Sequence, residues 1–139
     1  MEINLVGLAS AAATFFGVWL GHVSVRKIER EVERIWIPAV LALTSGLGLE
    51  LASFQAEGLI VSTICGILGI TLLWDSLELA YRQPRRVMKG HAPANPHNPR
   101  HARILAEHPE ATTIVWLARD PRGVPFSDEE IRAIRGQMK

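Results

Sequence analysis

The sequence predicts an all-α membrane protein with three transmembrane helices and a small cytoplasmic tail. The 139-residue chain holds three long apolar runs, at about 3–25, 35–54 and 59–80, and turns polar at Arg82. At 1.5 Å per helical residue, each run reaches roughly 30 Å, which is enough to cross the hydrocarbon core of a bilayer. A soluble three-helix bundle would need a polar stripe on every helix, and these runs carry none. We therefore expect residues 1–81 to form a transmembrane domain.

The first run has no charged residue between Ile3 and Val25, and its positive charges follow it. A cleaved signal peptide would begin with a positive segment, so we expect a retained helix with a translocated N-terminus. The basic and acidic residues of the next segment, 26–34, are spaced to form pairs on a helix. We expect this segment to continue the first helix.

The second and third runs carry few interruptions. Pro38 falls in the first turn of the second helix, where its missing N–H costs little. Glu50 is expected at the interface, near the outer face of the membrane. Pro84 follows the third run and is expected to end that helix, because proline disfavours helical backbone in the residue before it.

The basic residues predict the orientation of the chain. All 15 Lys and Arg residues lie in the segment 26–34 or after Tyr81. Basic residues remain on the cytoplasmic side, so we expect the N-terminus outside and the C-terminus in the cytoplasm. Trp19, Trp36 and Trp74 map near the cytoplasmic helix ends. They are expected to form one interfacial belt, with ordinary packing as the alternative.

Small residues predict how the helices pack. Lipid gives helices no hydrophobic reason to associate, so close approach of their backbones has to hold them together. Each run carries small residues at helical spacing. The predicted packing residues are Ala9, Ala13, Gly17, Gly21, Gly46, Gly66 and Gly69. These faces are expected to join the three helices, and they suit a homo-oligomer or a larger partner equally well.

Ionisable residues inside a membrane span are costly and are functional candidates by default. His22, Asp75 and Glu78 lie at similar depth, near the cytoplasmic ends of their helices. Asp75 and Glu78 share one helix side, because they are three residues apart. We expect the three residues to form a polar cluster. Its first interpretation is a structural hydrogen bond between helices, and the alternative is a proton relay or ion site.

No cofactor and no metal are expected. His22 is the one histidine in the three runs, and a bis-histidine haem needs two. His97 and His101 have the spacing of helical metal ligands, but Pro99 separates them. The single cysteine, Cys65, lies in an apolar run, where it behaves as a small hydrophobe. The sequence also has no phosphate loop and no nucleophile elbow. We expect neither an enzyme nor a nucleic-acid-binding protein.

Residues 82–99 read as a basic, proline-rich linker. Arg82, Arg85, Arg86 and Lys89 form a patch next to the membrane that suits anionic lipid headgroups. The three prolines that follow, within 93–99, predict an extended spacer.

Residues 100–139 read as a small tail with one or two short helices. A first helix is expected over 100–107, residues 112–118 are compatible with a short strand, and 120–123 with a turn. Ser127 and Glu130 form a capping box that opens a last helix at 128–137. Some 40 residues bury little core alone. The apolar segment 114–117 therefore suggests docking on a partner.

An ordered set of short motifs runs through residues 7–96. It comprises Gly7, Thr14-Phe15, Gly17, His22, Glu29, Trp36, Gly66, Gly69, Trp74, Glu78, Gln83, Arg86-Val87, Lys89-Gly90 and Asn95-Pro96. In this order the chain resembles a family of small bacterial membrane proteins named domain of unknown function 4491. It departs at Val23, where the family has proline, at His91-Ala92, where it has an aromatic pair, and in its longer tail. The resemblance implies three membrane helices and no established activity.

These observations favour a small non-catalytic subunit of a bacterial inner-membrane complex. The lipid bilayer and other membrane subunits, or further copies of the chain, would be its partners, and the tail would dock on a cytoplasmic partner. The alternative is a small oligomeric ion or proton transporter or channel that uses His22, Asp75 and Glu78.

Overall fold

The computed structural model describes residues 3–115 and 127–137 and divides the chain into two compact units. The first, which we call the membrane unit, contains residues 3–29 and 34–81. The second, the C-terminal unit, contains residues 30–33 together with the described residues after Tyr81. The division at Tyr81 falls where the sequence turns polar.

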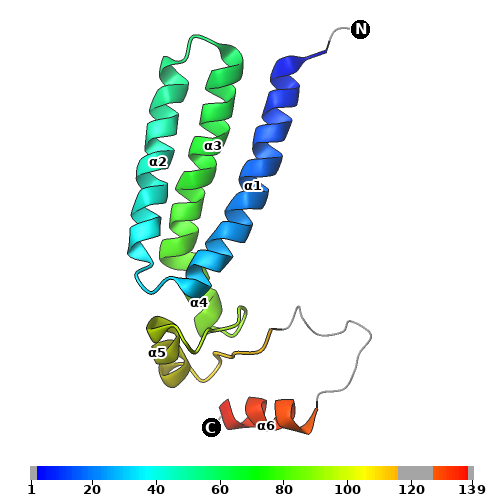
Figure 1. The fold of residues 1–139 in the computed structure, drawn as a ribbon, viewed down its shortest axis with the longest axis vertical. Helices are drawn as coiled ribbons and strands as arrows, with labels where there is room; N and C mark the ends of the chain where they lie inside the picture. The colour runs from blue at the N-terminus through cyan, green and yellow to red at the C-terminus, as the bar shows by residue number, and fades with distance from the viewer. Residues whose placement is uncertain (1–2, 116–126, 138–139) are drawn as a thin grey trace. The chain divides into compact units, whose positions relative to one another are not determined.

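Three long helices form the membrane unit: α1 (Leu5–Glu31), α2 (Trp36–Gln55) and α3 (Leu59–Leu77) (Figure 1). By length and composition, all three helical runs are able to cross a membrane. This confirms the predicted fold class of a multi-pass, helical membrane protein. Helix α1 continues through the charged segment to Glu31, as its paired charges predict.

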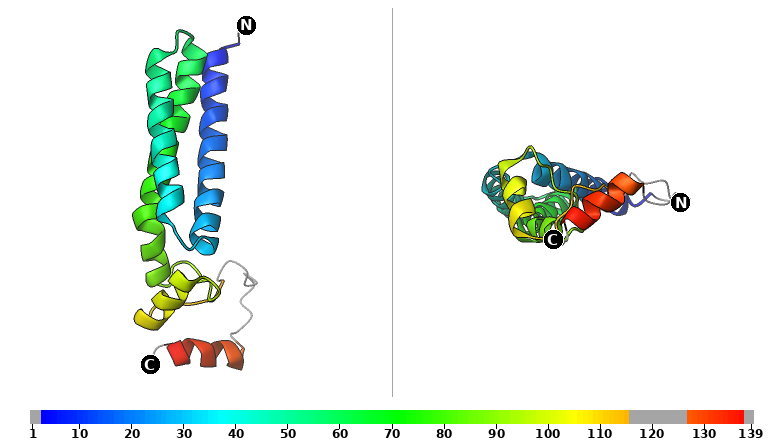
Figure 2. Two further views of the ribbon diagram at one scale, coloured as in Figure 1. Left: turned by 60° about the vertical axis from the view of Figure 1, so that its left-hand side comes forward. Right: turned by 90° about the horizontal axis from the view of Figure 1, so that it is seen from below.

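Helices α2 and α3 form a closely packed hairpin, joined by residues 56–58 (Figure 2). Near the turn, the Ser53 and Ser62 hydroxyls each donate to the other residue's backbone carbonyl, at 2.8 and 2.9 Å. Deeper in the hairpin, a Cβ added at Gly46 would lie 3.0 Å from the carbonyl oxygen of Gly69. Glycine thus lets the two backbones approach, which is how helices pack without water.

Helix α1 buries one stripe of residues spaced by four, and it faces α3 at Gly17 and Gly21, where an added Cβ would meet Thr71 and Asp75. The buried members are Ala13, Gly21, Val25 and Glu29, and Ala9 and Gly17 are half-buried on the same stripe. At the end of the bundle where α1 and α2 connect, Val25 joins a buried apolar cluster with Ala39 and Leu79. The stripe of small residues in α1 therefore lies inside the bundle of this chain.

Most of the outer surface of the membrane unit is apolar. The exposed side chains include Leu8, Phe15, Phe16, Leu20, Val23, Leu41, Leu47, Leu51, Phe54, Val61, Ile70 and Leu77. A water-soluble monomer rarely exposes so continuous an apolar surface. Such an apolar surface is compatible with a lipid environment.

The three tryptophans predicted to form an interfacial belt, Trp19, Trp36 and Trp74, are all exposed. Trp19 lies two residues before Gly21 and Trp74 directly precedes Asp75, and Gly21 and Asp75 are in contact. Trp36 is the first residue of α2 and lies at the end of the bundle, about two helical turns away along the axis. The single interfacial belt stays a prediction.

The third helical run does not end at Pro84, and that prediction is wrong. Helix α3 passes into a π-helix, η1 (Glu78–Arg82), and then into α4 (Gln83–Met88). Pro84 lies in the first turn of α4, where the missing N–H of proline costs no hydrogen bond within that helix. The wider π register directly before it changes the bonding of the preceding carbonyls, so the chain keeps its helical course.

The C-terminal unit has a small core of its own. Val87, Ala94, Ile104 and Ala111 are buried together, with Met88, Ala92 and Leu105 packed on them. Residues 82–99 are therefore folded and do not form the extended spacer that their prolines suggested. Residues 112–115 form no strand, and the rest of the segment considered for one, 116–118, lies outside the described residues, as does the expected turn at 120–123.

Two short helices follow α4 and match the predicted ones: α5 (Pro99–Glu107) and α6 (Asp128–Gln137). The capping box of α6 is confirmed. The Ser127 N–H donates to Glu130 Oε2 at 2.9 Å, and the Glu130 N–H donates to the Ser127 hydroxyl at 3.3 Å.

Candidate functional site

A polar seam runs between α1 and α3 in the membrane unit. Thr71, Asp75 and Glu78 share one face of the third helical run, because they are four and three residues apart. Opposite them, a Cβ added at Gly17 would lie 3.6 Å from the Thr71 hydroxyl, and one added at Gly21 would lie 2.6 Å from Asp75 Oδ2. The glycines of α1 therefore make room for polar side chains of α3.

His22 stands at the open edge of this seam. Its Nδ1 atom lies 3.9 Å from Glu78 Oε2, a distance that permits an ion pair with protonated histidine but no direct hydrogen bond. The histidine side chain is 55% exposed, whereas the Glu78 side chain is 10% exposed. Asp75 is also buried. The structure therefore brings together all three polar residues singled out in the sequence, with the histidine outermost.

Glu50 lies between helices, although its position in the sequence suggested the membrane interface. A Cβ added at Gly69 would lie 2.7 Å from Glu50 Oε1 and 3.1 Å from the Glu50 backbone nitrogen. The carboxylate of α2 thus rests on a glycine of α3 and is half-buried there. Gly66 of α3 similarly faces Ser53, whose hydroxyl oxygen would lie 3.2 Å from an added Cβ.

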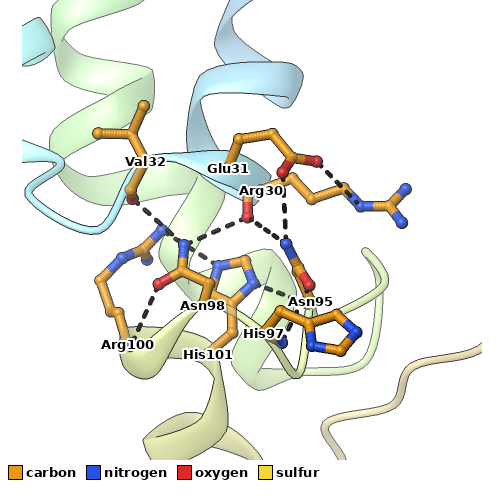
Figure 3. Close-up of polar contacts among 8 residues, drawn as sticks. All are labelled: Arg30, Glu31, Val32, Asn95, His97, Asn98, Arg100 and His101. Carbon is orange, nitrogen blue, oxygen red and sulfur yellow. Dashed lines mark hydrogen bonds and ion pairs between the residues drawn. The ribbon is translucent and has the colours of Figure 1, made fainter.

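A second polar arrangement, the asparagine clasp, lies in the C-terminal unit (Figure 3). It consists of Asn95 and Asn98, which bind backbone carbonyls in the last turn of α1 and directly after it. The Asn98 amide donates to the carbonyls of Arg30 and Val32 at 3.2 and 3.3 Å. The Asn95 amide donates to the Arg30 carbonyl at 3.3 Å. The last carbonyls of a helix lack partners within it, so the clasp caps the end of α1.

The same two asparagines also organise the chain around them. Asn98 Oδ1 accepts from the Arg100 N–H at 3.1 Å and so caps the start of α5. Asn95 Oδ1 accepts from the His97 N–H at 3.1 Å and forms an Asx turn. Asn98 is buried, with 3% of its surface exposed. Each side chain therefore joins two parts of the backbone.

His101 completes the clasp from α5. The Asn95 N–H donates to His101 Nδ1 at 2.9 Å, and the ring is fully buried. An accepting Nδ1 requires the neutral ring with its proton on Nε2. Arg100 Nη2, 3.1 Å from Nε2, is then a close neighbour and not a donor to it. The ring thus holds the Asn95 turn in place.

Comparison with known families now places the chain. The family described as Domain of unknown function (DUF4491) matches residues 4–98. The chain belongs to this family. The match spans the membrane unit and the clasp as far as Asn98, so that His101 and the rest of α5 lie beyond it. No curated protein and no solved structure matches the DUF4491 chain.

Four of the 15 basic residues of the DUF4491 chain lie on one face of α4 and its flanking residues. Arg82, Arg85 and Lys89 are exposed, and Arg86 is half-buried. The opposite face is buried through Gln83 and Val87. The segment 82–89 is therefore amphipathic, with its cationic side turned outward.

Sequence reasoning missed the clasp and the buried Glu29. From the sequence, Asn95 was considered only as part of a family motif, and His97 only as a metal ligand. Asn98 was not considered as a functional residue. The available signal was local: asparagine before Pro99 is a good N-cap for a helix starting there. Glu29 continues the stripe of Gly21 and Val25 at the same spacing, so its burial was readable from the pattern.

Proposed function

We propose that the DUF4491 chain is a non-catalytic subunit of a bacterial inner-membrane complex, with its N-terminus outside and its C-terminal unit in the cytoplasm. The clasp is the observation that carries this proposal. It gives the C-terminal unit a fixed shape, because both asparagine side chains bridge separate backbone segments. A preorganised surface loses less entropy when it binds a partner.

The seam supports the same function. The carboxylate of Asp75 lies directly against the backbone of Gly21, so these two residues fit together as parts of a helix interface. Polar side chains between membrane helices stabilise their association modestly and specify which faces meet. A structural role in one defined bundle therefore accounts for the buried carboxylates.

Co-purification tests the subunit proposal. The full chain, tagged at its C-terminus and expressed at its native level, would be extracted in mild detergent and its partners quantified by mass spectrometry. We expect a larger membrane protein in fixed stoichiometry. Asn98→Asp removes the two hydrogen bonds that the Asn98 amide donates, and we expect the partner to be lost from this variant. A chain recovered alone or only with further copies of itself would contradict the proposal.

One observation favours proton handling as a second candidate. An exposed His22 leads to a buried Glu78, which is an arrangement that delivers protons to a carboxylate inside a membrane span. Purified protein in liposomes with a pH-sensitive dye would then dissipate a proton gradient, and Glu78→Gln would stop the flux. Thr44→Ala, at an exposed residue of α2, is the control and should conduct normally. Equal leakage from wild type and Glu78→Gln would exclude this candidate.

A further inference from the structure

The cationic side of α4 is a run of basic residues that no acidic residue interrupts. Residues 82–89 contain Arg82, Arg85, Arg86 and Lys89 and no acidic residue. Their spacing of three and four residues gathers the four side chains along one side of the helical run. Three of the four are exposed. Four cations within two helical turns form a site for a polyanion or for clustered phosphates.

The core of the C-terminal unit fixes which way this side points. Val87 is 1% exposed and packs with Ala94, Ile104 and Ala111. Gln83, one turn earlier, is 3% exposed. These two residues lie on the buried side of α4, so the basic residues lie along its other side.

The length of the third helical run places the cationic side at the depth of lipid headgroups. The run spans Leu59–Met88, which is 30 residues. About 20 helical residues cross the hydrocarbon core, so roughly the last ten lie beyond it. The basic residues begin at Arg82, within those last ten. Arginine suits the phosphate group in particular, because its planar guanidinium donates two parallel hydrogen bonds.

We propose that Arg82, Arg85, Arg86 and Lys89 bind the phosphates of anionic phospholipids at the membrane surface. The site selects lipids by net negative charge and phosphate geometry. It therefore prefers phosphatidylglycerol to the zwitterionic phosphatidylcholine. Each charge near an anionic surface contributes about fivefold in local lipid affinity. This inference stands whether the chain is a subunit or a proton carrier.

Native mass spectrometry of the full chain tests the site. The protein would be released from micelles that contain equal amounts of phosphatidylglycerol and phosphatidylcholine, and its bound lipids counted. We expect several-fold enrichment of phosphatidylglycerol on wild type. The triple variant R85Q/R86Q/K89Q should fall to within about twofold of the bulk ratio, because three of four charges are gone.

Four further variants keep the test decisive. R26Q/K27Q/R34Q removes three exposed basic residues elsewhere and should retain the enrichment. R85K/R86K keeps the charge and should retain most of the phosphatidylglycerol enrichment. The single variants R85Q and K89Q should each lose part of this enrichment, which tests the site even if the triple variant fails to fold.

Three results would overturn the proposal. The first is equal loss in the two triple variants, which would indicate a general charge effect. The second is enrichment that survives R85Q/R86Q/K89Q. The third is evidence of a soluble ligand in place of lipid. Either displacement of the lipid by excess inorganic phosphate, or tight binding of a labelled single-stranded oligonucleotide without lipid enrichment, would be such evidence.

Discussion

At Gly21 the absence of a side chain allows the Asp75 carboxylate to lie against the backbone of α1. An added Cβ would stand 2.6 Å from Asp75 Oδ2, closer than packed atoms tolerate, so Gly21→Ala forces the carboxylate or the helix to move. We expect a loss of about 1–3 kcal/mol in the free energy of unfolding. Titration of detergent-solubilised protein with sodium dodecyl sulfate, followed by far-ultraviolet circular dichroism, measures it.

Gly48→Ala is the matched control for this substitution. Nothing lies within 4 Å of a Cβ added at Gly48, so alanine there should leave stability unchanged or raise it through its better helix propensity. The double variant Gly21→Ala with Asp75→Ala should recover much of the loss, because the clashing carboxylate is gone. Additive losses in the double variant would mean that the Gly21–Asp75 contact is not the cause.

The hydrogen bond from the Asn95 N–H to His101 Nδ1 leads to a second prediction. His101→Ala leaves the Asn95 N–H without its acceptor, at a cost of about 1–3 kcal/mol for a buried donor. His101→Asn places a side-chain oxygen near the former Nδ1 position and should retain part of the stability. Amide hydrogen exchange of residues 94–98 should therefore rise strongly in the alanine variant and less in the asparagine variant. The same protection in wild type and His101→Ala would refute the role of the ring.

At the residue scale, the sequence predicts how deep each residue lies along its own helix. His22, Asp75 and Glu78 could be grouped because helix depth and spacing follow directly from residue number. The clasp could not be found this way. Asn95 and Asn98 bind carbonyls more than sixty residues earlier in the chain, and any backbone segment offers carbonyls. No side-chain pattern therefore identifies the acceptor.

At the scale of elements, one side chain joins the end of α1 to the start of α5. Asn98 donates to the Arg30 and Val32 carbonyls and accepts from the Arg100 N–H. Asn98→Asp separates these roles, because a carboxylate remains a good N-cap but cannot donate and is repelled by the two carbonyls. We expect α5 to stay helical while amide exchange of residues 30–33 increases. Asn98→Ala should affect both elements, and if Asn98→Asp leaves residues 30–33 protected, the clasp does not hold them.

The turn after α4 depends on Gly90. Its φ of +68° is unfavourable for other residues, and a Cβ there would meet the carbonyl oxygen of Glu110. Gly90→Ala should destabilise the C-terminal unit by about 1–3 kcal/mol or more, which limited proteolysis of the reconstituted protein would detect as faster cleavage. Gly136→Ala, with nothing within 4 Å, should not be cleaved faster in the C-terminal unit. Equal cleavage of Gly90→Ala and wild type would contradict this account of the turn.

The elements themselves were largely predictable, and the exceptions have physical causes. Long apolar runs gave the three membrane helices, since lipid leaves few alternatives to a helix. The course through Pro84 was missed because η1 rearranges the backbone bonds just before it, and no residue type marks a π-helix. The fold of residues 82–99 was missed because proline spacing suggests an extended chain, whereas buried Ala94 and Asn98 anchor this segment.

At the scale of the whole molecule, charge placement predicts a single orientation in the membrane. The turn at 55–58 has no basic residue, and all basic residues lie in segment 26–34 or after Tyr81. Thiol labelling in a Cys65→Ser background tests this. Glu57→Cys should react with a membrane-impermeant maleimide in intact cells, because Glu57 is exposed in the turn between α2 and α3. Arg103→Cys, exposed on α5, should react only after the membrane is permeabilised. The reverse pattern would place the C-terminal unit outside the cell, and then neither a cytoplasmic partner nor the inner-leaflet lipids would be within its reach.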